Sequence, residues 1–315
     1  MKWKVLISAP YFQPVIERYR TFFTEHDIEI IVPTVHERLS EEELLQYAAD
    51  IDGALCGDDR FTRKVLERAK KLKVIAKWGT GIDSIDQEAA REFGIAIKNT
   101  PNAFTDAVAD LTMGFILSFA RNIPWADRDV RAGEWMNKRD GVSLSESTIG
   151  IIGLGSIGRA VACRAHTFGA TLLGFEAQEV QKDFLSETTV QLTSLQELLR
   201  KSNFITLHCT LNTETRHLIG LEQFALMKPT AVIVNTARGA LIDEAALVEA
   251  LRNKKIAGAA LDVFEEEPLP FNSPLRTFQN VLFSPHNANA SSSAWERVHE
   301  NTVKNLIEEL QKHDE

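Results

Sequence analysis

The sequence is poor in the features that mark secreted, metal-binding or membrane-spanning proteins. Among its 315 residues are only three cysteines, Cys56, Cys163 and Cys209, which lie far apart and form no CxxC pair. Neither a disulfide framework nor a zinc knuckle is therefore expected, and a reducing cytoplasm is the simplest location. The longest nearly apolar run, Leu111 to Ala120, is about half of the roughly 20 residues that cross a bilayer. No two histidines show a metal-binding spacing such as HExxH, so we predict no metal.

A surplus of positive charge is missing as well. The 35 Lys and Arg residues against 44 Asp and Glu residues give a formal net charge of −9. A surface of that sign repels phosphate backbones and anionic lipids, so neither nucleic acid nor a membrane is expected as a partner. Met1 to Lys4 lead directly into a strand-like segment, and we expect no signal peptide. What is present, 44% hydrophobic and 25% charged residues, is typical of a globular protein, and the length predicts two domains.

Short apolar runs rich in β-branched residues alternate with helical patterns, which is typical of parallel sheets built from βαβ units. A first series of runs predicts one small doubly wound sheet, and a second series matches a complete dinucleotide-binding fold. The first series is Lys4–Ala9, Ile28–Pro33, Gly53–Cys56, Lys73–Trp78 and Ile95–Lys98. The second series is Thr148–Gly153, Thr171–Phe175, Phe204–His208, Ala231–Asn235, Ala257–Val263 and Val281–Ser284.

Two longer segments have helical periodicity. Ala103 to Arg121 lies between the two series and predicts a connecting helix, because its apolar side chains recur at helical spacing. Ala294 to Leu310 places its apolar residues on roughly one helical face after the last strand has ended. Periodicity does not say where this final helix packs.

A glycine-rich segment follows the first strand of the second series. Its residues are Gly153, Gly155, Ser156, Ile157 and Gly158, in the order GxGxxG. Gly153 suits a tight turn, Gly155 the approach of a pyrophosphate, and Gly158 close packing of helix on strand. Glu176 ends the next strand, where a carboxylate binds ribose hydroxyls and repels a 2′-phosphate. The segment predicts NAD in preference to NADP, with a merely solvated Glu176 as the alternative.

Three further polar segments end predicted strands of the second series, at the edge where open α/β sheets bind ligands. They are Val234–Gly239, Leu261–Pro268 and Ser284–Asn289. Together with the glycine-rich segment and with Trp78–Asp86, they resemble the D-isomer-specific 2-hydroxyacid dehydrogenases, the family of phosphoglycerate, glycerate and D-lactate dehydrogenases. The resemblance covers nearly the whole chain.

The resemblance implies a division of the chain into two doubly wound α/β domains with a cleft between them. Residues 1–101 and 287–315 would form a discontinuous, flavodoxin-like substrate-binding domain, and residues 102–286 a Rossmann-type NAD-binding domain. Relatives usually pair through the cofactor domain, so a homodimer is expected. Candidates for its apolar surface, with an internal core as the alternative, are Leu111, Phe115, Phe119 and Trp125.

Reduction of a 2-oxoacid needs a cation for the carboxylate and carbonyl, a proton donor for the developing alkoxide, and a nicotinamide against one face of the carbonyl carbon. The resemblance assigns the first role to Arg238, whose planar fork suits a carboxylate, and the second to His286, since a histidine titrates near working pH. The carboxylate that favours the charged imidazole is assigned to Glu267, which precedes a proline. Glu265 and Glu266 are adjacent alternatives for that role.

The resemblance also implies contacts with cofactor and substrate. Asp262 would bind the nicotinamide carboxamide, and the backbone N–H groups of Trp78 and Gly79 would bind the substrate carboxylate together with Arg238. The expected cofactor contacts are Gly153, Gly155, Ser156, Ile157, Gly158, Glu176, Cys209, Thr210, Thr236, Ala237, Arg238, Asp262, His286 and Asn289.

The chain departs from the family pattern at two places. Where relatives commonly carry an Arg-Ser pair, this chain has Cys56-Gly57 followed by Asp58 and Asp59. Because a phosphate is usually held by Arg or Lys, this favours a small or polyhydroxy 2-hydroxyacid over 3-phosphoglycerate. Asn289 replaces a glycine that many relatives have, and since Asn tolerates a positive φ, the backbone turn there could survive.

Several functions remain as alternatives. A 3-phosphoglycerate dehydrogenase is one of them, although the chain stops too soon for the regulatory domain that some of these enzymes append, and feedback control by an amino acid is not predicted. A formate or phosphite dehydrogenase is disfavoured by Glu267, because formate dehydrogenases pair the active histidine with an upstream glutamine. An NAD-sensing interaction module without turnover, as in the family's transcriptional corepressors, is the alternative of a different class.

Overall fold

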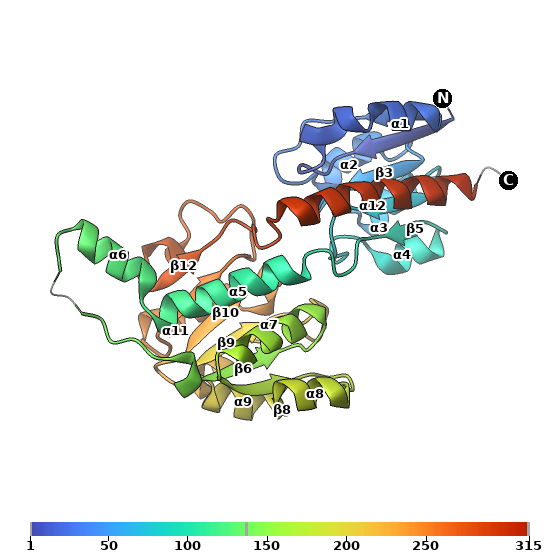
Figure 1. Ribbon diagram of the computed structural model, residues 1–315. Helices are drawn as coiled ribbons and strands as arrows, with labels where there is room; N and C mark the ends of the chain where they lie inside the picture. Colours follow the sequence, from blue (N-terminus) through green and yellow to red (C-terminus); the bar gives the residue numbers. More distant parts are fainter. Residues whose placement is uncertain (1, 136–137, 314–315) are drawn as a thin grey trace. The chain divides into compact units, whose positions relative to one another are not determined.

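The computed structural model describes residues 2–135 and 138–313. The chain divides into two compact units, the first comprising Met1–Phe104 and Ser291–Glu315 and the second Thr105–Ala290. Each unit contains one wholly parallel sheet with helices packed on its faces (Figure 1). The predicted α/β fold class is therefore confirmed.

The sheet of the first unit has the strand order β2-β1-β3-β4-β5. Its strands are β1 (Trp3–Ile7), β2 (Ile28–Ile31), β3 (Gly53–Cys56), β4 (Val74–Lys77) and β5 (Ala96–Lys98). All five were predicted, with ends that differ by at most two residues. The order is that of flavodoxin-like sheets, in which the topological switch point lies between β1 and β3.

Helices connect these strands, and one of them comes from the end of the chain. They are η1 (Gln13–Arg18), α1 (Arg20–Glu25), α2 (Glu41–Tyr47), α3 (Arg63–Arg68), α4 (Gln87–Glu92) and α12 (Ser292–Gln311). Helix α12 contacts β3, β4 and β5. It buries Val298, Leu306 and Leu310, and a Cβ on Gly53 of β3 would lie 3.0 Å from Leu306 Cδ1. The final helix thus packs on the first sheet, a position that its periodicity did not specify.

The sheet of the second unit has seven strands in the order β12-β11-β10-β9-β6-β7-β8. They are β6 (Thr148–Ile152), β7 (Thr171–Phe175), β8 (Gln191–Leu192), β9 (Phe204–Leu207), β10 (Val232–Asn235), β11 (Gly258–Leu261) and β12 (Val281–Phe283). Six were predicted. The seventh, β8, escaped prediction because it is an edge strand of two exposed residues with no apolar run.

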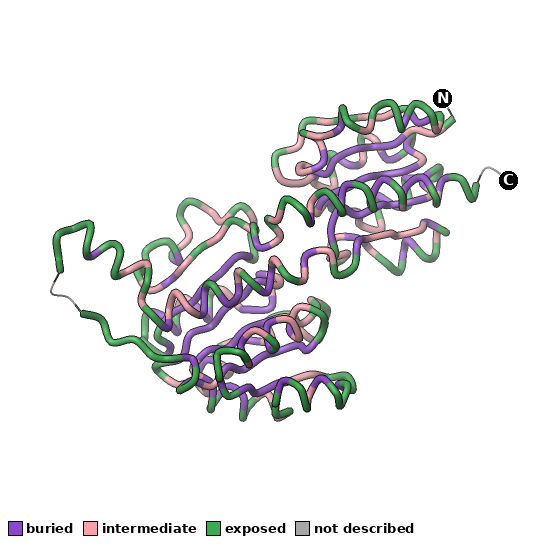
Figure 2. Tube along the Cα trace, viewed as in Figure 1, coloured by how far each residue is buried: buried purple, intermediate pink, exposed green. Residues whose placement is uncertain are grey.

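Helices cover both faces of this second sheet, and each face has its own hydrophobic cluster, visible as buried strands between helices in Figure 2. The helices are α5 (Thr105–Ala120), α6 (Ile123–Arg131), η2 (Leu144–Glu146), α7 (Ser156–Thr167), α8 (Lys182–Thr188), α9 (Leu195–Lys201), α10 (Leu221–Leu226), η3 (Gly239–Leu241), α11 (Glu244–Arg252) and η4 (Pro274–Thr277). Phe115 of the predicted connecting helix is buried in one cluster, and Leu111 and Phe119 pack against it. Ile123 and Val130 of α6 are instead exposed.

Candidate active site

The glycine-rich turn joins β6 to α7, and its three glycines have different surroundings. Gly153 has φ +92°, and a Cβ there would lie 2.5 Å from the Cys209 backbone nitrogen. A Cβ on Gly158 would lie 1.9 Å from the carbonyl oxygen of Gly153. A Cβ on Gly155, which is exposed, would meet nothing within 4 Å. The fold itself therefore requires Gly153 and Gly158, whereas Gly155 leaves open space at the first turn of α7, where a pyrophosphate fits.

Glu176 follows β7 and is turned toward the same loop. Its Oε2 accepts a hydrogen bond from the Leu154 N–H at 2.7 Å, and its Oε1 accepts from Ala177 and Gln178 at 2.8 and 3.2 Å. These three hydrogen bonds fix the carboxylate beside the glycine-rich turn.

The other expected cofactor residues of the second unit follow β9 and β10. Thr236 is buried, with its Oγ1 2.9 Å from Thr112 Oγ1, and Ala237 is half-buried. Burial raises the pKa of the Cys209 thiol to about 11, so the thiol stays neutral. Thr210 is exposed. A parallel sheet presents these residues at its carboxyl edge, the same edge as the glycine-rich turn.

His208 is a feature whose environment the sequence did not reveal. Its Nε2 lies 2.9 Å from Thr206 Oγ1, and its Nδ1 is buried without a hydrogen-bond partner among the described residues. Burial lowers the pKa of His208 to about 3. Its Cβ would be 3.5 Å from a Cβ on Gly158. A neutral imidazole therefore packs behind the glycine-rich turn.

His286 and Glu267 come together at the carboxyl edge of this sheet. His286 Nδ1 lies 2.8 Å from Glu267 Oε2, and Glu267 Oε1 accepts from the Phe264 N–H at 2.9 Å. Both side chains are partly accessible, at 26% and 16%. The pair can hold a proton on the imidazole and deliver it through Nε2 to a substrate oxygen.

The two neighbouring acids are directed elsewhere. Glu265 Oε1 lies 2.8 Å from His217 Nε2, and the Glu265 N–H donates to Glu244 Oε1 at 2.7 Å. Glu266 is exposed. Within this described segment, Glu267 is the acid whose carboxylate reaches His286.

Asp262 positions the histidine loop, and its geometry does not agree with the expected contact to a nicotinamide carboxamide. The side chain is fully buried, and its two oxygens accept from the N–H groups of Asn287 and Ala288 at 2.8 and 3.0 Å. Its carbonyl accepts from the His286 N–H at 2.7 Å. The positive φ expected near Asn289 belongs to His286 instead, at 51°. This loop conformation directs the imidazole toward Glu267.

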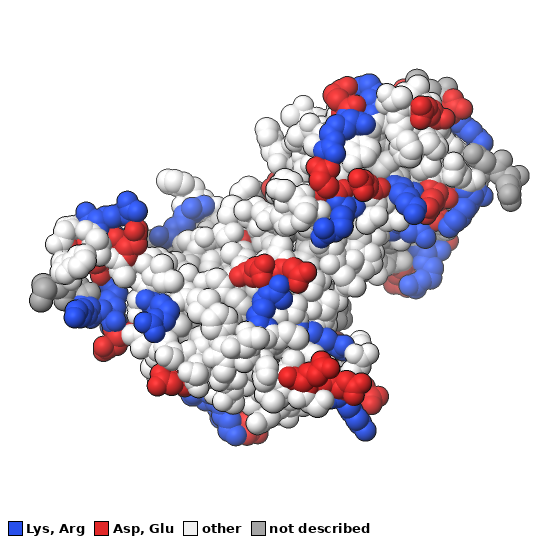
Figure 3. Space-filling view, viewed as in Figure 1, with Lys and Arg blue, Asp and Glu red and all other residues white. Residues whose placement is uncertain are grey.

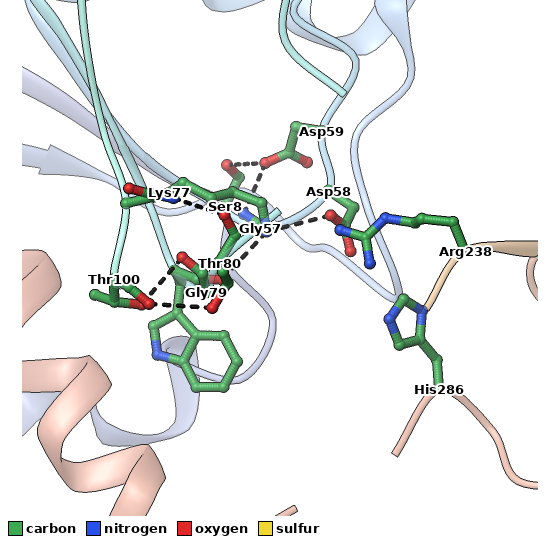
Figure 4. A network of polar contacts seen from close by, with 12 residues as sticks. Ser8, Gly57, Asp58, Asp59, Lys77, Gly79, Thr80, Thr100, Arg238 and His286 are labelled. Carbon is green, nitrogen blue, oxygen red and sulfur yellow. Dashed lines mark hydrogen bonds and ion pairs between the residues drawn. The ribbon is translucent and has the colours of Figure 1, made fainter. Parts of the chain in front are cut away.

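Arg238 follows β10 in a loop that Asn235 braces. Asn235 Nδ2 donates to the Arg238 carbonyl at 2.8 Å, and Asn235 Oδ1 accepts from the Ala237 N–H at 3.1 Å. A Cβ on the next residue, Gly239, would lie 1.9 Å from the carbonyl carbon of Phe264, so the β10 and β11 loops pack directly on each other. Figure 4 shows the Arg238 and His286 side chains projecting from their loops.

In the first unit, the Trp78 N–H is not available to a substrate. It donates to the Cys56 carbonyl at 2.8 Å and so extends the ladder between β3 and β4. The expectation that this group binds the substrate carboxylate is therefore wrong. Gly79 has φ +123°, and the N–H groups of residues 79–81 have no hydrogen-bond partner in the described chain. Gly79 is one of the two expected donors, and the other two free N–H groups belong to the next two residues.

Asp59 is a structural residue rather than an exposed charge. It is fully buried, and its carboxylate accepts from Ser8 Oγ at 2.6 Å, from the Gly57 N–H at 3.2 Å and from the Leu39 N–H. Burial raises the pKa of this carboxyl despite these donors. Asp59 thus ties the end of β1 to the loop after β3.

Asp58 and Lys77 form an ion pair that the sequence did not reveal. Lys77 Nζ lies 3.2 Å from Asp58 Oδ1 and donates to the Trp78 carbonyl at 3.2 Å. The Lys77 side chain is 5% exposed, and that of Asp58 is 34% exposed. Figure 4 marks this ion pair with a dashed line beside Gly57. No local pattern predicts the pair, because it depends on the register that sets the end of β3 beside the end of β4.

Within the described ranges, no group of three or more His, Cys, Asp or Glu side chains is arranged to hold a metal ion. No described helix is long and apolar enough to cross a membrane. Acidic and basic side chains are interspersed over the face drawn in Figure 3.

Comparisons with known proteins place this geometry in a family. Residues 113–288 match the family model described as "D-isomer specific 2-hydroxyacid dehydrogenase, NAD binding domain". The chain is 45% identical over 294 residues to a D-3-phosphoglycerate dehydrogenase of Methanocaldococcus jannaschii, covering 92% of this chain but only 54% of that protein. It is 42% identical over 313 residues to a glyoxylate reductase of Aeropyrum pernix, covering 96% of this chain and 92% of that protein. The crystal structure of a D-lactate dehydrogenase from Aquifex aeolicus, complexed with NAD and lactic acid, superposes with a TM-score of 0.87 at 27% identity, covering 99% and 96% of the two chains.

Proposed function

Because the chain belongs to the D-isomer-specific 2-hydroxyacid dehydrogenase family, we propose that it transfers a hydride between NAD(H) and C2 of a small or polyhydroxy 2-hydroxyacid or its 2-oxoacid. The observation that carries this proposal is the His286–Glu267 pair on the sheet that also bears the glycine-rich turn. The sheet supplies a dinucleotide-binding edge, and the pair supplies an acid–base group at that edge.

The chain's own residues supply the proton and the charge stabilisation. Bound NADH provides the hydride. In reduction, His286 donates the Nε2 proton to the oxygen as the alkoxide forms, and in oxidation the same nitrogen accepts the hydroxyl proton. Glu267, 2.8 Å from Nδ1, orients the imidazole and stabilises its charged form. Arg238 binds the carboxylate and polarises the carbonyl.

We assign the free N–H groups of residues 79–81 to the substrate carboxylate as additional hydrogen-bond donors. They replace the Trp78 N–H, which donates to the Cys56 carbonyl. Backbone donors suit a carboxylate that is common to every 2-oxoacid, whereas the side chains around them decide which tail is accepted. One relative is named a glyoxylate reductase and another a D-3-phosphoglycerate dehydrogenase, so the substrates to be tested range from glyoxylate to a phosphorylated 2-oxoacid.

We propose NAD rather than NADP as the working cofactor. The Glu176 carboxylate, fixed by three backbone N–H groups, would bind the ribose hydroxyls and repel a 2′-phosphate. The kcat/KM for NADH is expected to exceed that for NADPH at least tenfold, and a preference for NADPH would contradict the assignment.

We also propose a homodimer that uses helix α6 of the second unit. Exposed apolar side chains are concentrated there and just after it, with Ile123 54%, Val130 53% and Trp135 77% exposed. Burial of such side chains stabilises association. Analytical ultracentrifugation should give twice the 35.2 kDa mass of the chain, and Val130→Asp should shift the protein toward the monomer. A monomeric wild-type protein would exclude this interface.

The decisive experiment is NADH oxidation with a panel containing glyoxylate, pyruvate, hydroxypyruvate, 3-phosphohydroxypyruvate and sugar-derived 2-oxoacids. Turnover of glyoxylate, pyruvate, hydroxypyruvate or a sugar-derived 2-oxoacid supports the proposal. Turnover of 3-phosphohydroxypyruvate alone would identify a phosphoglycerate dehydrogenase instead. Binding of NADH without oxidation by any 2-oxoacid would identify an NAD-sensing module.

A further inference from the structure

A buried tryptophan precedes the loop that carries the free N–H groups, and a histidine from the last helix binds its ring. Trp78 directly precedes residues 79–81. Its indole Nε1–H donates to Nδ1 of His299 at 2.9 Å. His299 lies on helix α12, and both side chains are buried. Because Trp78 and His299 belong to the same compact unit, the contact is internal to the unit that bears the loop.

This hydrogen bond defines the state of the imidazole. An indole N–H is only a donor, so His299 Nδ1 is the acceptor, and the neutral ring carries its proton on Nε2. Burial lowers the pKa of His299 and favours this neutral form, against the charge of Glu296. Trp78 Nε1 has no other acceptor in the described chain, and a buried N–H without an acceptor is costly. His299 therefore determines the direction in which the indole points.

The indole is packed among other aromatic rings that connect it to the loop. The centroid of the Trp78 ring lies 5.3 Å from that of Tyr11, 5.8 Å from that of Trp295 and 5.7 Å from that of Phe104. Phe104 in turn lies against the loop, because a Cβ on Gly79 would be 3.8 Å from Phe104 Cε2. In so closely packed a cluster, a Trp78 ring that turned away from its acceptor would displace Phe104, and the backbone at Gly79 would shift with it.

Hydrogen bonds hold the carbonyl groups of the same loop. The Gly79 carbonyl accepts from the N–H and the Oγ1 of Thr100 at 2.9 and 3.0 Å. The Thr80 carbonyl accepts from Asn99 Nδ2 at 2.6 Å. Figure 4 shows Thr100 beside Gly79 and Thr80. With these carbonyl groups bound, the N–H groups of residues 79–81 keep one orientation as long as the aromatic packing is intact.

We propose that His299 is a positioning residue for substrate binding: by accepting the Trp78 indole N–H, it holds the N–H groups of residues 79–81 in place for the substrate carboxylate. This inference rests on the proposed 2-hydroxyacid dehydrogenase function. In this role His299 acts through Trp78 and makes no contact with the substrate itself. Donors that are already ordered bind a carboxylate more tightly, because binding does not have to order them.

The expected effect of losing this hydrogen bond is on KM. The carboxylate is present in the substrate and in the transition state alike, so disordered donors should weaken the binding of both equally. A loss of that kind raises KM and leaves kcat nearly unchanged. Because every 2-oxoacid has the carboxylate, the rise should be the same for glyoxylate and for hydroxypyruvate. The NADH dissociation constant should not change, since the glycine-rich turn belongs to the other unit.

The test compares variants of the intact chain. His299→Leu removes the acceptor and Trp78→Phe removes the donor, and each should raise KM for both substrates at least fivefold, with kcat within twofold of the wild type. His299→Asn should keep KM within twofold of the wild type, because Asn Oδ1 is as many bonds from the backbone as His Nδ1 and also accepts. The double variant His299→Leu, Trp78→Phe should have a KM no higher than the worse single variant, since both changes remove the same hydrogen bond.

Leu306→Ala is the matched control for a general loosening of α12. Leu306 is buried on the same helix as His299, and a Cβ on Gly53 of β3 would lie 3.0 Å from its Cδ1. Its truncation should lower the urea concentration at the midpoint of unfolding and leave KM within twofold of the wild type. If His299 acted only by stabilising the helix, the two positions would behave alike.

The outcomes separate this inference from the proposed function. A KM rise below fivefold in either folded variant, His299→Leu or Trp78→Phe, would overturn the role of His299 and leave the dehydrogenase function intact. A larger effect on kcat than on KM, or a KM more than twofold above the wild type in His299→Asn or Leu306→Ala, would do the same. Should His299→Leu not fold, Trp78→Phe and His299→Asn decide. Absence of NADH oxidation by the wild type with any 2-oxoacid would overturn the proposed function and this inference with it.

Discussion

His286 Nδ1 lies 2.8 Å from Glu267 Oε2, although the two residues are 19 positions apart in the sequence. The contact joins the loop after β11 to the loop after β12. The Phe264 N–H donates to Glu267 Oε1, and the N–H groups of His286 and Ala288 donate to the carbonyl and the carboxylate of Asp262. An imidazole held on one nitrogen in this way presents its other nitrogen in a fixed direction. That is the geometry of a positioned acid–base group.

Replacement of His286 by Asn should lower kcat by roughly 10²- to 10⁴-fold, the usual contribution of a positioned general acid. The NADH dissociation constant should change much less, because the glycine-rich turn is untouched. Steady-state kinetics together with NADH fluorescence titration would measure both. A loss of kcat below tenfold would remove His286 from the mechanism.

The change Glu267→Gln should shift the pH profile to lower pH in both directions of the reaction. A carboxylate favours the charged imidazole, so its loss makes the ring give up its proton at lower pH. The alkaline limb of reduction and the acidic limb of oxidation should therefore both move down. Glu266→Gln, at an exposed neighbouring position, is the control and should leave the profile in place. An unmoved profile in Glu267→Gln would mean that another acid acts on His286.

Replacement by Ala should lower folding stability at Gly158 and NADH affinity at Gly155. At Gly158 the new Cβ would lie 1.9 Å from a backbone carbonyl oxygen, so the turn must deform, and we expect a loss of about 3 kcal/mol or more in the free energy of unfolding. At Gly155 the Cβ meets open space, and unfolding should change by less than about 1 kcal/mol. NADH affinity should nevertheless fall at least tenfold in Gly155→Ala, because a methyl group would occupy the approach of the pyrophosphate. Urea unfolding and NADH titration measure the two quantities. Equal behaviour of the variants would contradict the division of roles.

Charge at Glu176 should control discrimination between the two dinucleotides. Glu176→Gln keeps the size of the side chain but removes the repulsion toward a 2′-phosphate, so the NADH-to-NADPH ratio of kcat/KM should fall at least tenfold. Glu179→Gln, an exposed acid in the same loop, serves as the control. If both variants keep the wild-type ratio, the carboxylate of Glu176 has no part in cofactor choice.

Sequence patterns predicted the strands and the glycine-rich turn well because these depend on local periodicity and on backbone conformation. Gly153 is an example, since its φ of +92° is itself a reason for glycine at that position. The patterns did not reveal the partner of Lys77, the backbone contact of the Trp78 N–H or the inward direction of Asp59. Each of these depends on strands that meet only in the folded sheet. Asp262 is a further example of what sequence patterns do not reveal. An aspartate at the end of a strand can either brace a loop or bind a cofactor, and the sequence does not distinguish the two; in the structure its carboxylate accepts from two backbone N–H groups of the histidine loop.

The buried imidazole of His208 should make the protein less stable in acid. Its pKa is lowered to about 3 in the folded chain, against about 6.5 for an unfolded histidine, so between these values the unfolded state binds one proton more than the folded state. The free energy of unfolding must therefore fall as the pH falls through this window, by up to about 1.4 kcal/mol per pH unit from this residue. His208→Gln should reduce that slope between about pH 6 and pH 4, whereas His313→Gln, at an exposed position near the end of α12, should not. Urea unfolding at several pH values measures the slopes. Identical slopes in the wild type and His208→Gln would show that His208 is protonated in the folded protein as readily as in the unfolded chain.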